Sequence, residues 1–152
     1  MNKLRVHSGD WVIVCDGRKA LILENSGDEK FPNLRMREVR EHDDASTHSQ
    51  GVDVPGRVHQ SLTAARSAVE QTDWHDLAER NFLQALVRHL DAALTGKLVD
   101  KLIVVAPPRA LGVLRRAYTP ALQHAVSVEI DKDWVRMPIH EIEEKLLHQR
   151  DS

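Results

Sequence analysis

Acidic residues stand at two places where metal-dependent chemistry could be built. Asp16 follows a strongly apolar run, and Glu129, Asp131 and Asp133 alternate along a later segment. A strand would bring these last three to one face, and acids that hold two divalent ions can hydrolyse phosphodiester bonds. The apolar run 102–106, however, ends in two prolines with no carboxylate. Asp16 is more typical of a tight Asp-Gly turn than of a metal ligand, so we predict no metal site and keep a metal-dependent nuclease as the third hypothesis.

Arginine side chains are the second candidate chemistry, because a guanidinium group and a helix N-terminus together bind phosphate. They gather in three stretches of the chain: Arg35, Arg37 and Arg40; Arg57 and Arg66; Arg109, Arg115 and Arg116. The alternative is a solvated surface of mixed charge, which the formal net charge of −2 favours.

Other catalytic and cofactor motifs are missing from the sequence. The nine histidines have no zinc-site spacing, and the single cysteine cannot complete a structural metal site. There is no glycine-rich phosphate loop and no nucleophile elbow. Cys15 lies within an apolar run and is expected to behave as a small buried hydrophobe. We therefore predict no cofactor.

Composition limits the partners and the location. The 152 residues suffice for one domain with a full core, and the aromatic content of 4% is low for stacking on single-stranded nucleic acid. The near-neutral charge excludes a surface that is basic throughout. The N-terminus lacks the apolar core of a signal peptide, and no apolar run reaches membrane-spanning length. A cytoplasmic protein is expected.

Strands and helices that would position these groups can be read from the apolar pattern. Strands are predicted at 11–16, 19–25, 34–39, 101–106 and 127–131, the first two joined by Asp16-Gly17. A long helix is predicted from an N-cap at Asp73 to a C′ residue at Gly96. Shorter helices are predicted at 109–118, from Pro120 through His124, and after Pro138.

The predicted order, β-β-β-α-β-α-β-α, indicates an α/β fold: a mixed five-stranded sheet with helices packed on it. It is the order of ribonuclease-H-like domains. Residues 1–152 are expected to form one domain with a long mobile loop at about 40–70, which could hold a helical fragment at 60–70.

Several blocks of the sequence resemble the bacterial host-attachment protein family. The most specific are Val105-Ala106-Pro107-Pro108-Arg109 and Glu129-Ile130-Asp131-Lys132-Asp133, with Trp11–Gly17 and Pro55-Gly56-Arg57 beside them. The resemblance covers nearly the whole chain. It implies a relationship to the catalytic middle domain of eukaryotic and archaeal peptide release factors, and hence a ribosome or tRNA as partner.

Release factors carry Gly-Gly-Gln in a mobile loop before the corresponding helix. Here that place reads Gly56-Arg57-Val58-His59-Gln60-Ser61, so the resemblance makes Gln60 the candidate catalytic residue and Arg57, Arg66 and Arg109 candidate RNA contacts. Val58 is β-branched and resists the backbone angles that glycine allows, which argues against robust hydrolysis. Residues 64–68 are an alternative match to the release-factor loop.

Two functions of different kinds follow. One is a release-factor-like module that associates with the ribosome or tRNA without robust catalysis. The other is a protein-interaction or regulatory module for host-cell attachment, with a protein partner and no nucleic-acid contact. Ribosome binding that weakens as salt rises would distinguish them.

Overall fold

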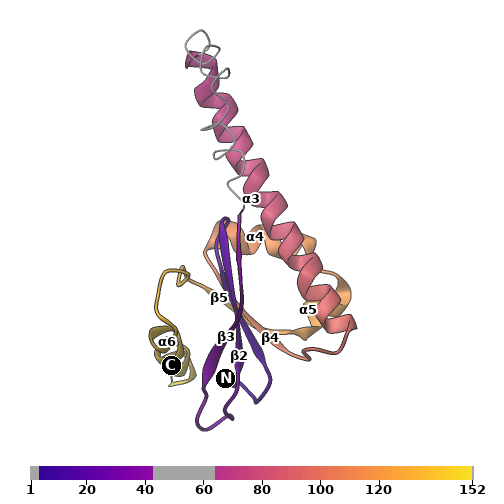
Figure 1. Cartoon of the computed structure of the whole chain (residues 1–152), viewed down its shortest axis with the longest axis vertical. Coiled ribbons are helices and arrows are strands. Elements are labelled where there is room, and N and C mark those ends of the chain that lie inside the picture. The colour runs from indigo at the N-terminus through magenta and orange to yellow at the C-terminus, as the bar shows by residue number, and fades with distance from the viewer. Residues whose placement is uncertain (1–3, 43–63, 152) are drawn as a thin grey trace.

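Helices cover both faces of a mixed five-stranded sheet in the computed structural model, which describes residues 4–42 and 64–151 (Figure 1). The elements are β1 (Trp11–Cys15), β2 (Lys19–Asn25), β3 (Leu34–Glu41), α3 (Ala64–Thr95), β4 (Leu102–Ala106), α4 (Pro108–Ala117), α5 (Pro120–Ala125), β5 (Val126–Asp131) and α6 (Ile139–Asp151). The α/β class and the order of elements agree with the prediction. None of the described helices is long and apolar enough to cross a membrane.

The strands are arranged in the order β3-β2-β1-β4-β5. β1, β2 and β3 form an antiparallel meander, whereas β1 with β4 and β4 with β5 are parallel pairs. Short connections suffice for the meander, but each parallel pair requires a crossover, and α3 and then α4 with α5 supply the two crossovers. β2, β1 and β4 therefore pair with neighbours on both sides, and β1 is the middle strand.

The core is split between the two faces of the sheet because successive strand residues point in opposite directions. Trp11, Ile13 and Cys15 of β1 face the layer formed by α3, α4 and α5. Val12 and Val14 face the other layer, which contains α6 and the N-terminal segment with Leu4 and Val6. Both layers bury β4 completely, as its uninterrupted apolar sequence predicts.

The long helix begins earlier than the sequence pattern indicated. α3 starts at Ala64, so Asp73 lies within the helix and is not its N-cap. No glycine or proline occurs between Gly56 and Gly96, and without a helix breaker the alanine-rich stretch 64–68 continues the helix towards the N-terminus. Residues 43–63 of the predicted mobile loop lie outside the described residues.

The C-terminal end of α3 also differs by one residue from the prediction. Lys97, with a φ of 60°, occupies the left-handed position that was expected at Gly96. The amide of Leu98 donates to the carbonyl of Ala93 at 2.9 Å, and that of Lys97 to Leu94 at 3.0 Å. This is the Schellman arrangement with Lys97 as the C′ residue.

Candidate functional site

A cleft of about 750 Å³ lies at the carboxyl ends of the central strands β1 and β4. From β1 the chain turns to β2 on one side, and from β4 it leads to β5 on the other. Open α/β sheets bind ligands outside the carboxyl strand ends at such a point of divergence. The β1–β2 turn, α3 and the start of α4 line the cleft, so its position and its walls mark it as the candidate site.

Asp16 lies in the cleft wall as the first residue of the β1–β2 turn. Its Oδ1 atom accepts hydrogen bonds from the amides of Arg18 and Lys19, both at 2.8 Å. Its own amide donates to the carbonyl of Lys19 at 2.9 Å. An aspartate that binds the amides after it is a typical turn residue, so the predicted Asp-Gly hairpin is confirmed.

Gly17 allows α3 to pack directly over this turn. A Cβ atom at Gly17 would lie only 2.8 Å from both Cγ and Cδ of Glu79. The Glu79 carboxylate, in turn, lies 4.0 Å from Nε of Arg18. The turn and the helix therefore form one continuous wall.

Five guanidinium groups line the cleft. They come from the turn, from α3, from α4 and from the segment between β5 and α6: Arg18, Arg80, Arg109, Arg116 and Arg136. Arg109 forms an ion pair with Asp76, and Arg18 faces Glu79. Arg80, Arg116 and Arg136 make no ion pair with any acidic residue in the described part of the chain.

The other three predicted acids do not line this cleft. Asp131 is the last residue of β5, where it is paired with Ala106, and it lines a different groove. Asp133 lies beyond the end of β5 and is exposed, so the expected alternation along one strand face stops at Asp131. Glu129 binds Arg115 at 2.8 Å and the Tyr118 hydroxyl at 3.0 Å.

A metal centre has no ligand cluster in the described residues. Within residues 4–42 and 64–151, no group of three or more His, Cys, Asp or Glu side chains could hold a metal ion. Burial raises the pKa of the Cys15 thiol to about 12, which makes it a poor nucleophile at neutral pH.

The remaining sequence candidates are distributed as follows. Arg109 is in the cleft. Gln60 and Arg57 lie outside the described residues, and Arg66 belongs to the first turns of α3 with its side chain outside the described part. Two of the three arginines of β3 have structural partners: Arg37 binds Glu24 at 2.9 Å and covers the Trp11 ring, and Arg40 binds Glu38 at 3.1 Å.

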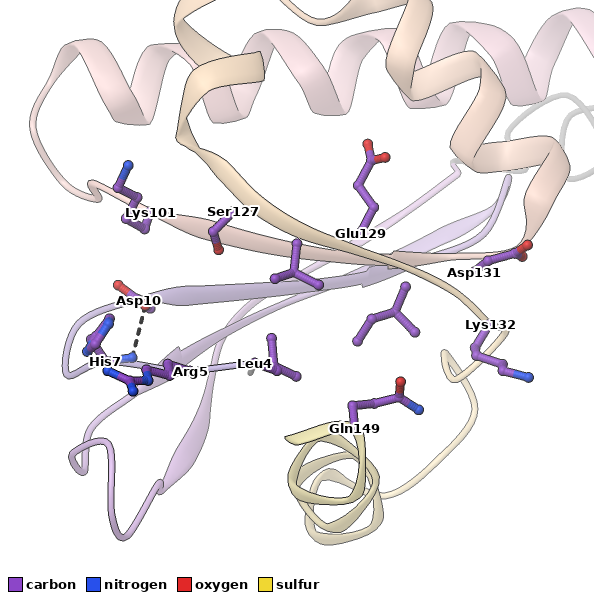
Figure 2. A pocket seen from close by; sticks show the side chains of 12 residues that line it. Leu4, Arg5, His7, Asp10, Lys101, Ser127, Glu129, Asp131, Lys132 and Gln149 are labelled. Carbon is purple, nitrogen blue, oxygen red and sulfur yellow. Dashed lines mark hydrogen bonds between the residues drawn. The ribbon is translucent and has the colours of Figure 1, made fainter. Parts of the chain in front are cut away.

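A second, larger groove of about 1110 Å³ follows the outer edge of β5 (Figure 2). It is lined by the N-terminal segment, β5 and Gln149 of α6. Within it the Asp10 carboxylate accepts a hydrogen bond from the His7 amide at 2.9 Å. Desolvation raises the pKa of Asp10 despite that bond. Its charges are mixed, with Arg5, Lys101 and Lys132 beside Asp10 and Asp131, so it favours no ligand class.

Sequence reasoning missed Arg80 and Arg136 as site residues. Both are exposed and isolated in the sequence, and only the packing of α3 and of the β5–α6 connection beside α4 brings them to Arg116. A signal was available for Arg18, which directly follows the Asp-Gly turn at the carboxyl end of β1.

Comparison with known proteins adds one match. The model of the family described as bacterial archaeo-eukaryotic release factor family 12 matches residues 10–146, which include every element from β1 to most of α6. No curated protein matches the chain. The family match confirms the release-factor relationship predicted from the sequence blocks.

Proposed function

Because the chain belongs to bacterial archaeo-eukaryotic release factor family 12, we propose that it associates with the ribosome or with tRNA. In this proposal the N-terminal half of α3 and the segment just before it make the contact. The protein binds without robust peptide release.

The observation that carries the proposal is the way α3 extends beyond the sheet (Figure 1). Its 32 residues correspond to a length of about 48 Å. Among the α3 side chains that the structure describes, from Trp74 onward, packing on the main core begins at Phe82 and Leu83, whereas Trp74 and Leu77 are 53% and 44% exposed. About five turns of helix backbone precede Phe82. A projecting helix of this kind suits insertion into a narrow binding site of a larger particle.

The segment before α3 contains the chemistry that the release-factor relationship suggests. Gly56-Arg57 and Gln60-Ser61 match release-factor positions, but Val58-His59 replaces the glycine pair. Since a β-branched residue disfavours the positive φ values open to glycine, close approach of this backbone to a peptidyl-tRNA ester is hindered. Gln60 would then contribute to binding more than to hydrolysis.

A protein-interaction module for host-cell attachment is the second candidate function. Trp74 and Leu77 favour it, because two large apolar side chains lie exposed one turn apart on the projecting helix. Tryptophan is enriched at the centres of protein interfaces. In this case the partner is a protein, and salt has little effect on its binding.

Co-sedimentation of the purified protein with ribosomes over a salt series tests the two functions. Ribosome association should weaken steeply between about 50 and 200 mM salt, and Arg57→Ala with Arg66→Ala should weaken it further. Arg88→Ala is the matched control, since Arg88 is exposed on the sheet-packed part of α3. Absence of binding to ribosomes and tRNA at low salt would reject the proposal.

Catalysis is tested separately on ribosomes loaded with peptidyl-tRNA. No robust hydrolysis is expected from the wild-type chain. Hydrolysis that disappears in Gln60→Ala, with the fold intact, would contradict the non-catalytic form of the proposal and make Gln60 a catalytic residue.

A further inference from the structure

Three arginines that form no ion pair with any acidic residue that the structure describes line the cleft at the carboxyl ends of β1 and β4. Arg80 comes from α3, Arg116 from α4 and Arg136 from the connection between β5 and α6. They are far apart in the sequence, so only the tertiary fold brings them to one cavity. All three are exposed to solvent, and their donors are available to a ligand.

The acids of the cleft are already engaged by other groups. Asp16 binds the turn amides, Asp76 binds Arg109, and Glu79 faces Arg18. The lining therefore holds five arginines against three carboxylates, an excess of two positive charges. This positive charge is local, because the whole chain has a formal net charge of −2.

The basic side chains that line this cleft are all arginines, which indicates the kind of anion that would bind. Five of the fourteen arginines in the chain line this cleft, together with no lysine. The guanidinium group is planar and offers paired donors that match two phosphate oxygens, which an ammonium group does not. The first residues of α4, Pro108 to Ala110, line the same cleft, so the positive end of that helix adds to the potential.

We propose that this cleft is a phosphate-binding site, in which Arg80, Arg116 and Arg136 contact the phosphate groups of a nucleic-acid strand or of a nucleotide. Its volume of about 750 Å³ lies in the range of small-ligand sites. Asp76, Glu79 and Arg80, at the base of the projecting part of α3, belong to this cleft, but the test of the cleft uses no ribosome. Either proposal can therefore fail without the other.

We expect the fold to tolerate the loss of these three side chains. They make no ion pair with another residue that the structure describes, so their removal relieves repulsion between like charges. A triple variant, Arg80→Ala with Arg116→Ala and Arg136→Ala, should unfold at the same temperature as the wild type or slightly above it.

The experiment measures binding of two probes to the full chain at low salt. One probe is a short fluorescein-labelled oligouridylate followed by anisotropy, and the other is ATP followed by calorimetry. Whichever probe the wild-type chain binds, each single variant should weaken that binding about tenfold. The triple variant should weaken it about a hundredfold or more. Arg88→Ala is the matched control, because Arg88 is an exposed arginine of the same helix outside the cleft.

The pattern across the two probes identifies the source of the phosphate. Oligouridylate binding that the triple variant loses and Arg88→Ala retains supports the site and assigns it to a strand. The same pattern for ATP supports the site and assigns it to a nucleotide. A wild-type chain that binds neither probe, a triple variant that binds both normally, or equal weakening by Arg88→Ala would overturn the proposal. The single variants keep the test valid if the triple variant does not fold.

Discussion

Substitution of Asp16 separates a structural aspartate from a catalytic one. Asp16→Ala removes the acceptor of two backbone amides at 2.8 Å, whereas Asp16→Asn keeps an oxygen at the same place. Each lost hydrogen bond is worth about 0.5–1.5 kcal/mol. The alanine variant should therefore lose about 1–3 kcal/mol of unfolding free energy, and the asparagine variant less than about 0.5 kcal/mol.

Urea denaturation of the three proteins provides the measurement. With a denaturant dependence of about 1–3 kcal/mol per molar urea, the alanine variant's midpoint should fall by about 1 M and the asparagine variant's should stay close to wild type. Equal destabilisation by both substitutions would mean that the negative charge matters and the hydrogen bonds do not. A manganese-dependent nuclease activity that is lost in Asp16→Asn would refute the turn interpretation and restore the metal hypothesis.

Two further predictions concern stability outside the cleft. Lys97→Gly should raise the free energy of unfolding by about 0.5–1 kcal/mol, because the left-handed φ of 60° at Lys97 strains a non-glycine residue; a lower melting temperature would contradict this. Glu38 contacts His89 at 2.8 Å, and although partial burial alone would raise the pKa of Glu38, its bonds and charge interactions with His89 and Arg40 lower it. A lowered pKa means that the carboxylate stabilises the fold at neutral pH and loses this effect as pH falls below about 4. His89→Ala should therefore reduce the loss of stability in that acid range, and an unchanged stability–pH curve would show that the pair contributes nothing.

The sheet could be predicted from the sequence because its signals are local. Asp16-Gly17 specifies a turn within four residues, and the apolar run 102–106 specifies a strand buried on both faces. The ends of α3 were harder to predict from the sequence. Asp73 is a residue type that often caps a helix, but no glycine or proline lies between Gly56 and Asp73 to stop one. The helix propensity of the residues before Asp73 therefore extends α3 to Ala64. At the other end, Lys97 adopts a left-handed backbone conformation, which a lysine in the sequence does not predict.

The arginine cleft could not be predicted because its charge comes from distant parts of the chain. Arg115 and Arg116 are neighbours in the sequence, and the sequence gives no reason to assign them different roles. The fold separates them: Arg115 binds Glu129, and Arg116 turns into the cleft beside Arg80 and Arg136. Net charge conceals such a site, since acidic residues elsewhere balance it.

The two surfaces of α3 can act independently because they lie on different faces of the helix. At about 100° per residue, positions 76, 79, 80 and 83 fall on one side, and all four line the cleft. Trp74 and Leu77 fall on the other side and are exposed. A phosphate ligand in the cleft therefore leaves Trp74 uncovered, and a protein bound to Trp74 leaves Arg80 open. If Trp74→Ala with Leu77→Ala abolishes ribosome association and leaves probe binding in the cleft unchanged, the two surfaces are separate. Loss of both together would mean that they form one continuous binding surface.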